Sequence, residues 1–418
     1  MNMINVRRLA VMTFLGAGML SDISAQDFSL QADTLNEARL PAQWDLQSCI
    51  DYALEQNITI RKNRVTAEST QIDVKTAKAA LFPSLSFSTS QQVVNRPYQE
   101  TSSRVSGSEI ISSNSKTSYN GNYGLNASWT IYNGSKRLKT LKQERLNNQV
   151  AELDVATSEN TIKESIAQIY IQILYAAESV RVNENTLQVS IAQRDRGQEL
   201  LNAGSIAKSD FAQLEAQVST DRYQLVTAQA TLQDYKLQLK QLLELDGENE
   251  MNVYLPKLSD ENVLAPLPAK KDVYVSALAI RPEIEASKLN VEASELGIDI
   301  AKSSYFPTIS LSAGIGTNHT SGSDFTFGEQ VKNGWNNSIG LSVSVPIFNN
   351  RQTKSAVQKA KLQRETDMLS LLDEQKALYK TIESLWLDAN SAQQRYAAAN
   401  EKLRSTQISY DLISSIGV

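Results

Sequence analysis

Residues 81–90 read LFPSLSFSTS and separate two stretches whose apolar residues have helical spacing. Within this segment apolar side chains alternate with serine, and the same alternation recurs at residues 119–131, 308–315 and 335–347. A period of two sends successive side chains to opposite faces of a β-strand. The pattern therefore predicts four strands, each with an apolar face and a face of small polar side chains.

The two faces of these strands are expected to meet different media. Each segment is about 10 to 13 residues long, the length of a tilted strand that crosses a bilayer. Aromatic residues such as Tyr119, Trp129 and Trp335 lie near segment ends, where interfacial girdles form. The polar face is too rich in Ser, Asn, Thr and Gly for a dry interior. Alternation alone would also suit a soluble sheet packed on a core.

We expect the apolar face to contact membrane lipid and the polar face to line a water-filled lumen. The expected lipid-facing residues are Leu85, Phe87, Leu125, Trp129, Leu311, Leu341 and Val343. The expected lumen-facing residues are Ser86, Ser88, Asn126, Ser310, Ser342 and Ser344. Four strands cannot close a barrel in lipid, because the open edges would leave backbone groups unpaired. The strand count therefore predicts that several copies share one barrel, with the loops 95–117 and 317–334 at its outer end.

The chain is expected to contain two copies of one plan. A shift of about 224 positions aligns TAKAALFPSLSFS with IAKSSYFPTISLS, and a shift of about 216 aligns WTIYNGSKR with VPIFNNRQT. We predict a first repeat at residues 26–250, a linker at 251–271 and a second repeat at 272–418. Each repeat would run helix, strand, loop, strand, long helix.

Residues 1–25 have the pattern of a secretory signal peptide. Arg7 and Arg8 precede an apolar run that ends in small residues at Ala25. The apolar run is too short to span a bilayer as a helix. We therefore expect the leader to be cleaved and the mature chain to be exported.

The stretch from residue 135 to 196 contains neither Gly nor Pro and predicts a single helix on the order of 90 Å long. One apolar seam with alternating spacings of three and four follows it, and a second seam beside it predicts neighbours on two sides. The first seam consists of Ile162, Ile166, Ile169, Ile173, Ala176, Val180 and Leu187. In the turn that follows, Gly204 is expected to be left-handed and Ser209 to cap the next helix.

The second repeat is expected to be truncated before its own turn. By the repeat register, Leu201 and Asn202 correspond to Gly417 and Val418, the last residues of the sequence. The equivalent of the first repeat's returning helix is therefore expected to be missing, which would leave the seam through Tyr396, Leu403 and Tyr410 exposed.

Together, the leader, the doubled plan, the LFPSLSF and YFPTISL strand entries, the PIFNN exit and the LNAGSIAKSDFAQLEAQ turn resemble the TolC-like outer membrane efflux proteins, or outer membrane factors. The resemblance implies an α+β membrane protein of the cell outer membrane with a large periplasmic portion. It implies a homotrimer whose twelve-stranded β-barrel, four strands per chain, continues as a long periplasmic α-helical barrel.

The resemblance also implies partners. Such a protein is the passive exit duct of a tripartite efflux or type I secretion system, and it docks to a periplasmic adaptor (membrane fusion) protein and an inner-membrane RND or ABC pump. The family's adaptor-docking tip corresponds to Ala203, Gly204, Ser205, Ile206 and Asp210. The rival interpretation is a barrel-anchored structural coiled-coil rod or adhesin that transports nothing.

The charged residues, the single histidine and the single cysteine argue against a nucleic-acid-binding protein and against an enzyme. The formal net charge is -5 and no basic face gathers Lys and Arg, so no nucleic-acid partner is expected. His319 is the only histidine and is expected in a solvated loop, and Cys49 is the only cysteine and is expected to be buried. These residues cannot supply a Cys/His pair, a Ser/His/Asp triad or a histidine-rich zinc site. We expect no enzymatic activity, catalytic residue, metal or cofactor.

Overall fold

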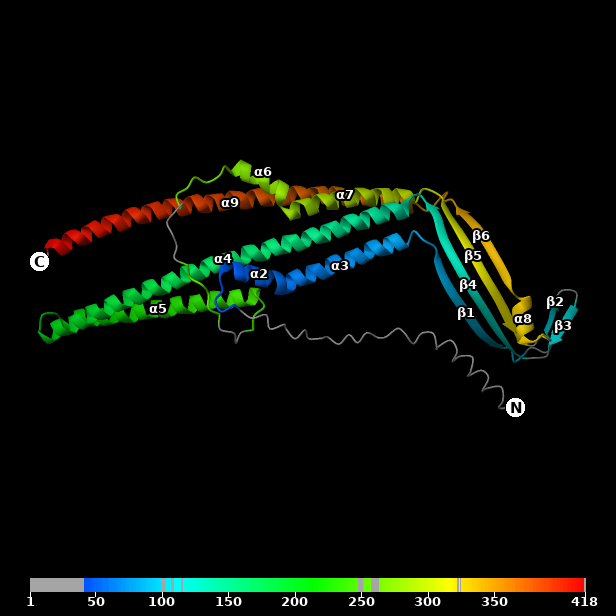
Figure 1. The fold of residues 1–418 in the computed structure, drawn as a ribbon, viewed down its shortest axis with the longest axis horizontal. Coiled ribbons are helices and arrows are strands. Elements are labelled where there is room, and N and C mark those ends of the chain that lie inside the picture. The colour runs from blue at the N-terminus through cyan, green and yellow to red at the C-terminus, as the bar shows by residue number, and fades with distance from the viewer. Residues whose placement is uncertain are drawn as a thin grey trace.

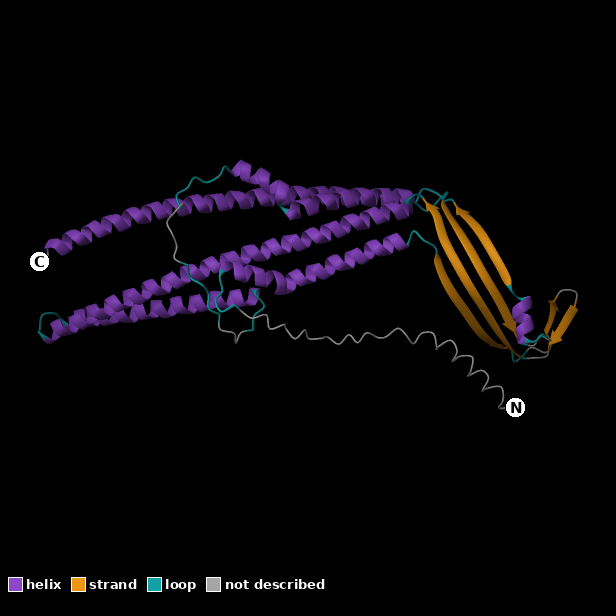
Figure 2. Ribbon diagram, in the orientation of Figure 1, coloured by secondary structure: helices purple, strands orange, loops and turns teal. Residues whose placement is uncertain are grey.

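The computed structural model describes residues 41–98, 102–106, 109–113, 116–246, 251–256, 263–321, 323 and 325–416. The expected signal peptide, residues 1–25, lies outside the described residues. The molecule is elongated, with long helices at one end and a β-sheet at the other (Figure 1). Figure 2 shows that the long helices and the strands occupy separate parts of its length, with one short helix beside the strands.

Both halves of the chain contain two helices, a strand, a second strand and a long helix in that order, and each half has additional elements of its own. The first half contains α2 (Leu46–Gln56), α3 (Ile58–Ala79), β1 (Ser84–Asn95), β2 (Ser102–Ser106), β3 (Glu109–Ser113), β4 (Thr117–Asn133), α4 (Lys136–Asn202) and α5 (Lys208–Leu242). The second half contains α6 (Lys270–Ile280), α7 (Pro282–Ser303), β5 (Thr308–Thr320), α8 (Phe327–Asn333), β6 (Asn336–Ser344) and α9 (Gln352–Ile416).

The predicted long helix is confirmed and runs farther than expected. α4 has 67 residues, about 100 Å at 1.5 Å per residue, and passes through Gly197 to its last turn. Gly197 is buried against α5, where an added Cβ would collide with the side chain of Leu214. Ile166, Ile173 and Leu187 of the predicted seam are buried, so this seam faces neighbouring elements as expected.

The main sheet has the strand order β1-β4-β5-β6, and all its pairs are antiparallel. Each strand is joined to its own helix: β1 to α3, β4 to α4, β5 to α7 and β6 to α9. Those helices pack in the same lateral order, because α3 contacts α4, α4 contacts α7 and α7 contacts α9. The helical layer is thus a continuation of the sheet, and α4 has neighbours on two sides as its two seams predicted.

The loops of the sheet contain structure that the sequence did not predict. The first loop contains the hairpin β2-β3, and the second contains α8. Thr326 caps α8 and exchanges hydrogen bonds with Glu329 in a capping box. The sequence identified both segments only as loops, without these elements.

A compact core lies beside the middle of α4. Trp44 forms a parallel bridge with Val253: its N–H donates to the Asn252 carbonyl at 2.8 Å, and its carbonyl accepts from the Tyr254 N–H at 2.8 Å. The Tyr170 hydroxyl also donates to the Tyr254 carbonyl, at 2.6 Å. These bonds tie the segment before α2 and the segment after α5 to α4.

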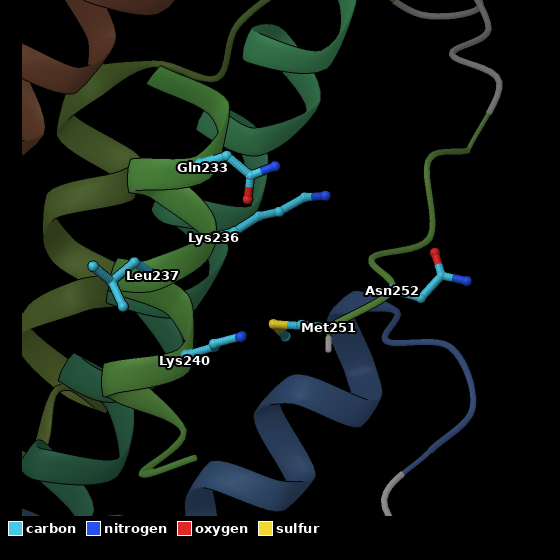
Figure 3. A pocket seen from close by; sticks show the side chains of 6 residues that line it. All are labelled: Gln233, Lys236, Leu237, Lys240, Met251 and Asn252. Carbon is cyan, nitrogen blue, oxygen red and sulfur yellow. The ribbon is translucent and has the colours of Figure 1, made fainter. Parts of the chain in front are cut away.

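The outer side of this core is closed by Met251, which is buried beside Val253. Figure 3 shows Lys236 and Lys240 of α5 next to Met251, with Asn252 farther along the same segment. The ammonium groups stand at the rim of a shallow pocket. Apolar packing therefore gives way to a polar surface within one layer of side chains.

The only cysteine lies inside this core, as predicted. Cys49 is 0% exposed, and burial raises the pKa of its thiol to about 12. The reactive thiolate is therefore almost absent near neutral pH.

We expect Cys49 to resist thiol reagents at pH 8 in the folded protein, because the thiol is both buried and protonated. Unfolding in denaturant should make it react fully, as measured by a maleimide mass shift. Tyr98→Cys, at an exposed position, is the matched control and should react in the folded state. Rapid labelling of native Cys49 would contradict the burial.

Candidate channel wall and docking surfaces

The strand register gathers the apolar side chains on one face of the sheet. Antiparallel partners share a face, so residues of the four strands can be grouped into rows across the sheet. The apolar rows are Ile309–Val343, Trp129–Leu311–Leu341, Leu85–Ala127–Ala313–Ile339 and Phe87–Leu125–Ile315, the last of which ends in the polar Asn337 on β6. All seven residues expected to face lipid lie on this face.

The opposite face is built from small polar residues. Its rows include Ser86–Asn126–Gly314–Ser338, Thr130–Ser310–Ser342, Thr308–Ser344 and Ser88–Gly124–Gly316–Asn336. All six residues expected to line a lumen lie here. The four strands contain no Asp, Glu, Lys or Arg, so this face offers hydroxyls and amides without fixed charge.

Neither face of the sheet is covered by a core within the described residues. On the apolar face Leu85 is 71% exposed, Phe87 67%, Ile339 83% and Leu341 64%. On the polar face the serines of β1 and β6 are exposed as well. The alternative of a soluble sheet packed on a core therefore does not fit this structure. An apolar surface of this extent is unfavourable in water and marks an interaction surface.

Both edges of the layer are open in the described chain. β1 and β6 are the outer strands of the sheet, and α3 and α9 are the outer helices joined to them. Ile58, Val65 and Ile72 form an exposed heptad stripe on α3. The first half of α9 carries a comparable exposed stripe, composed of Leu362, Leu369 and Leu372. Each edge therefore combines unpaired strand groups with an apolar helix surface.

The second half of α9 also exposes apolar side chains. Leu403, Tyr410 and Ile413 are exposed, and Tyr396 is half-buried. In the first half of the chain, the corresponding part of α4 is covered by α5.

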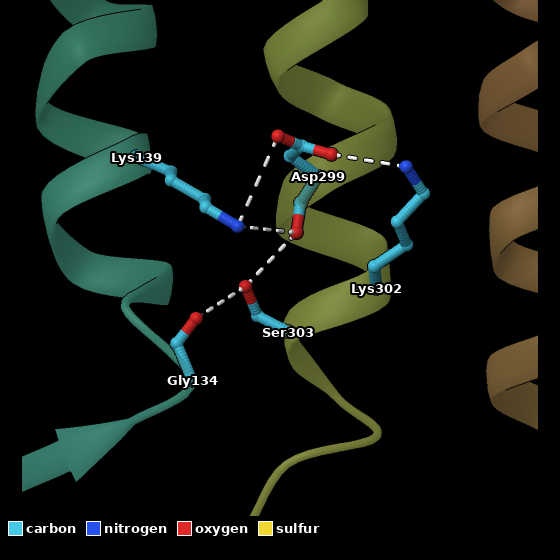
Figure 4. Close-up of polar contacts among 5 residues, drawn as sticks. All are labelled: Gly134, Lys139, Asp299, Lys302 and Ser303. Atoms are coloured by element: carbon cyan, nitrogen blue, oxygen red, sulfur yellow. Dashed lines mark hydrogen bonds and ion pairs between the residues drawn. The ribbon is translucent and has the colours of Figure 1, made fainter.

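A polar junction holds the sheet against the helices (Figure 4). The hydroxyl of Ser303, 2% exposed, lies 2.9 Å from the carbonyl oxygens of both Gly134 and Asp299. Lys139 contacts the Asp299 carboxylate at 3.9 Å and its carbonyl oxygen at 3.4 Å, and Lys302 contacts the carboxylate at 3.1 Å. The single hydroxyl proton is shared between these two carbonyl oxygens, so the buried hydroxyl links the end of β4 and the start of α4 to α7.

The backbone passes from β4 into α4 at this junction through two left-handed residues. Gly134 has φ 67° and Ser135 has φ 62°. The same conformation recurs between β6 and α9, where Asn350 has φ 49° and Arg351 has φ 65°. A Cβ at Gly134 would lie 2.6 Å from the Ser303 carbonyl oxygen, so this position requires glycine both for its φ and for space.

We expect Gly134→Val to destabilise the chain by about 2 to 5 kcal/mol, the sum of left-handed strain and overpacking. Ser135→Gly is the control: it relieves the same φ without adding atoms and should leave stability equal or higher. Denaturant midpoints of the two variants and the parent protein measure both effects. Equal midpoints for Gly134→Val and the parent would contradict the role of the junction.

The turn between α4 and α5 lies at the end of the molecule remote from the sheet (Figure 1). Gly204 has φ 73°, as predicted, and the Ser205 N–H donates to the Leu200 carbonyl at 2.8 Å. The residues expected to dock an adaptor are all brought to this end: Ala203, Gly204, Ser205 and Asp210 are exposed, and Ile206 is half-buried.

The predicted cap at Ser209 was wrong. α5 begins at Lys208, its N-cap residue is Ala207, and no side chain caps it. The Ser209 hydroxyl instead donates to the Asp210 carboxylate at 3.3 Å. The extended conformation of Ala207 starts the helix two residues earlier than a Ser209 cap would.

A groove between α4 and α5 runs up to this turn. It includes two of the predicted tip residues, Ile206 and Asp210, and Leu214 of the returning helix. It also includes residues that the sequence did not single out: Gln193, Arg196, Gly197, Leu200, Gln213 and Gln217. These residues recur every three or four positions on the two helices, and this spacing is the pattern from which the groove could have been predicted. The same spacing also occurs in a closely packed helix-helix contact, so it does not distinguish the two.

His319 does not lie in a solvated loop as expected. It belongs to β5, and its ring packs edge-on against Tyr119 at 5.6 Å and Phe327 at 5.0 Å between centroids. Among the described residues no group of three or more His, Cys, Asp or Glu is arranged to hold a metal ion. No helix in the described part of the chain is both long enough and apolar enough to cross a membrane.

This is a chain whose four-stranded sheet exposes an apolar and a polar face and continues as long paired helices. The sequence model of the family described as outer membrane efflux protein matches residues 49–244 and 273–415. The chain therefore belongs to the outer membrane efflux protein family, and the predicted family is confirmed.

Individual relatives are distant and longer. The chain is 26% identical over 255 residues to the outer membrane efflux protein BepC of Brucella suis, covering 60% of this chain and 53% of BepC. It is 24% identical over 305 residues to the outer membrane protein TolC of Escherichia coli, covering 70% of this chain and 59% of TolC. The chain thus spans little more than half the length of these two relatives.

A solved structure of CusC has a similar fold. It superposes with a TM-score of 0.70 at 20% identity, covering 89% of this chain and 83% of CusC. This likeness supports the arrangement of helices and strands described above.

Proposed function

We propose that this chain is a subunit of an outer-membrane channel, the passive exit duct of a tripartite efflux or type I secretion system. The main support is the sheet, which has one exposed apolar face, one exposed uncharged polar face and, within the described residues, no core on either side. Lipid against the apolar face and water against the polar face would solvate both faces favourably. Membership in the outer membrane efflux protein family supports the same interpretation.

The barrel is proposed to be a homotrimer with twelve strands. One chain supplies four strands, and open edges in hydrocarbon would leave backbone groups unsatisfied. Two copies would give eight strands, whose interior is just wide enough for side chains to fill. Three copies would give twelve strands, which leave room for water inside the barrel. Where β1 of one copy pairs with β6 of the next, the apolar stripes of α3 and α9 would also meet.

The two halves of the chain are proposed to be copies of one unit, residues 26–250 and 272–418, joined by the linker 251–271. The paired left-handed residues at the two strand exits support this organisation. The ends of α3 and α7 also match. The Phe82 N–H donates to the Ala79 carbonyl, and the Phe306 N–H donates to the Ser303 carbonyl.

In this duct the long helices form a periplasmic tube, and the α4-α5 turn is its adaptor-docking tip. The turn lies about 100 Å from the start of α4, far from the sheet. We propose a periplasmic adaptor protein as the direct partner and an RND or ABC pump in the inner membrane as the energy source. The uncharged wall performs no chemistry on the cargo.

Planar bilayer recording of the purified, oligomeric protein tests the channel. Steady conductance steps are expected from a water-filled barrel. Silence from a sample that is shown to be oligomeric and inserted would favour the barrel-anchored rod or adhesin.

Charge on the two faces should have unequal consequences. Leu341→Arg places a cation on the proposed lipid face and should destabilise the inserted barrel by about 2 to 4 kcal/mol near the midplane. Ser342→Arg, one residue along β6, points into the lumen and should cost far less. Urea titration in liposomes, followed by heat-modifiable gel migration, compares the two. Equal tolerance would refute the assigned orientation.

The tip turn should be sensitive to backbone shape. Gly204→Val forces a β-branched residue into φ 73° and should abolish crosslinking to a co-expressed periplasmic adaptor while oligomers persist. Gly204→Asn tolerates positive φ and should retain most crosslinking. Undiminished crosslinking of the valine variant would remove the turn from the docking surface.

A further inference from the structure

The helix α8 contacts β5 at the end of the sheet remote from the long helices (Figure 1). The Thr317 hydroxyl donates to the Val331 carbonyl at 2.8 Å, and the His319 ring packs on Phe327. Thr317 and His319 alternate in register with Ile315 and therefore point to the same face as the apolar rows. α8 is thus outside the proposed barrel wall and does not plug the lumen.

The chemistry of this face changes at the level of α8. Below it lie the rows of Leu, Ile, Ala and Phe, whereas the next row is Thr89–Tyr123–Thr317 and the one after it is Gln91–Gly121–His319. The Tyr119 hydroxyl hydrogen-bonds Gln91 on the same face. Aromatic rings with a polar tip beside neutral polar groups are typical of a membrane-water interface.

α8 and the residues beside it expose both aromatic rings and charged groups. Phe325, Phe327 and Trp335 at and beside the helix are exposed large rings. Glu329 and Lys332 on the same short helix are exposed charges. In water three exposed rings would be unfavourable, whereas lipid headgroups accept both the rings and the charges.

The distance along the strand agrees with a headgroup position. The apolar rows of β5 run from Ile309 to Ile315, so their centre lies at Ser312. From Ser312 to His319 a strand rises about 23 Å, which is about 18 Å along the membrane normal at a tilt near 40°. Half of a hydrocarbon layer of about 30 Å is about 15 Å, so His319 would lie just beyond the hydrocarbon, at the level of the headgroups.

We propose that α8, with Phe325 and Trp335, is an interfacial collar that lies among the lipid headgroups of the outer leaflet and fixes the depth of the barrel. This inference rests on the proposed function, since it assumes that the apolar rows face lipid. Each copy contributes one collar segment, so an oligomeric barrel would carry a ring of them.

Spin labels on the full oligomeric protein in phosphatidylethanolamine and phosphatidylglycerol vesicles test the depth. Gly328→Cys places the label on α8, where an added Cβ meets nothing within 4 Å, and Phe325→Cys provides a second site. Ile339→Cys reports the apolar face, Ser338→Cys the polar face and Tyr98→Cys a fully exposed loop. Buried Cys49 stays unlabelled and needs no replacement.

Power saturation with oxygen and a water-soluble nickel chelate gives the result. We expect the labels at 325 and 328 to have several-fold lower nickel accessibility than the label at 98, and several-fold higher than the label at 339. If both match the label at 98, α8 stands in water and the collar is refuted; if both match the label at 339, α8 lies in hydrocarbon and it is equally refuted.

The control sites separate this inference from the proposed function. A label at 339 that contacts lipid, together with a label at 338 that contacts water, keeps the channel interpretation whatever α8 does. If the label at 339 is nickel-accessible and shielded from lipid, the orientation of the sheet fails, and the collar fails with it.

Discussion

Unpaired backbone groups at the two edges of one small sheet constrain the rest of this molecule. β1 and β6 each present a row of N–H and C=O groups without a strand partner in the described chain. In water these groups would be solvated, but in hydrocarbon each unsatisfied group costs several kcal/mol. A sheet with an exposed apolar face can therefore lie in lipid only when another copy pairs with its edges. Assembly and membrane insertion become one requirement.

The helices follow the same constraint because each strand of the sheet continues into its own helix. The order β1-β4-β5-β6 becomes α3-α4-α7-α9 beyond the junction of Ser303 with Gly134. Closing the edges of the sheet would bring α9 of one copy beside α3 of the next. The exposed stripes of Ile58, Val65 and Ile72 and of Leu362, Leu369 and Leu372 are placed for that contact. The need to pair the edge strands would thus also determine how helices of neighbouring copies pack, far from the membrane.

Much of this arrangement could be predicted from the sequence. Alternation in LFPSLSFSTS and its three counterparts identified the strands, and the absence of Gly and Pro identified α4. The errors have a common cause. The hairpin β2-β3 and α8 formed in segments rich in Ser, Asn and Gly, whose composition indicates loops. The local signal for α8 was the capping-box spacing of Thr326 and Glu329, and a contact with β5 adds to it. His319 was placed in a loop because the Ser-rich residues after it hid the end of β5.

The sequence by itself determined which side chains share a face of each strand and which glycines allow a turn, because both depend on neighbours within a few residues. The tertiary structure alone decided the row-by-row register, the hydrogen-bonded junction at Ser303, the groove beside the α4-α5 turn and the position of α8 on the apolar face. Each of these joins residues far apart in the chain. No local pattern encodes such a contact, since it forms only when separate elements have already been brought together.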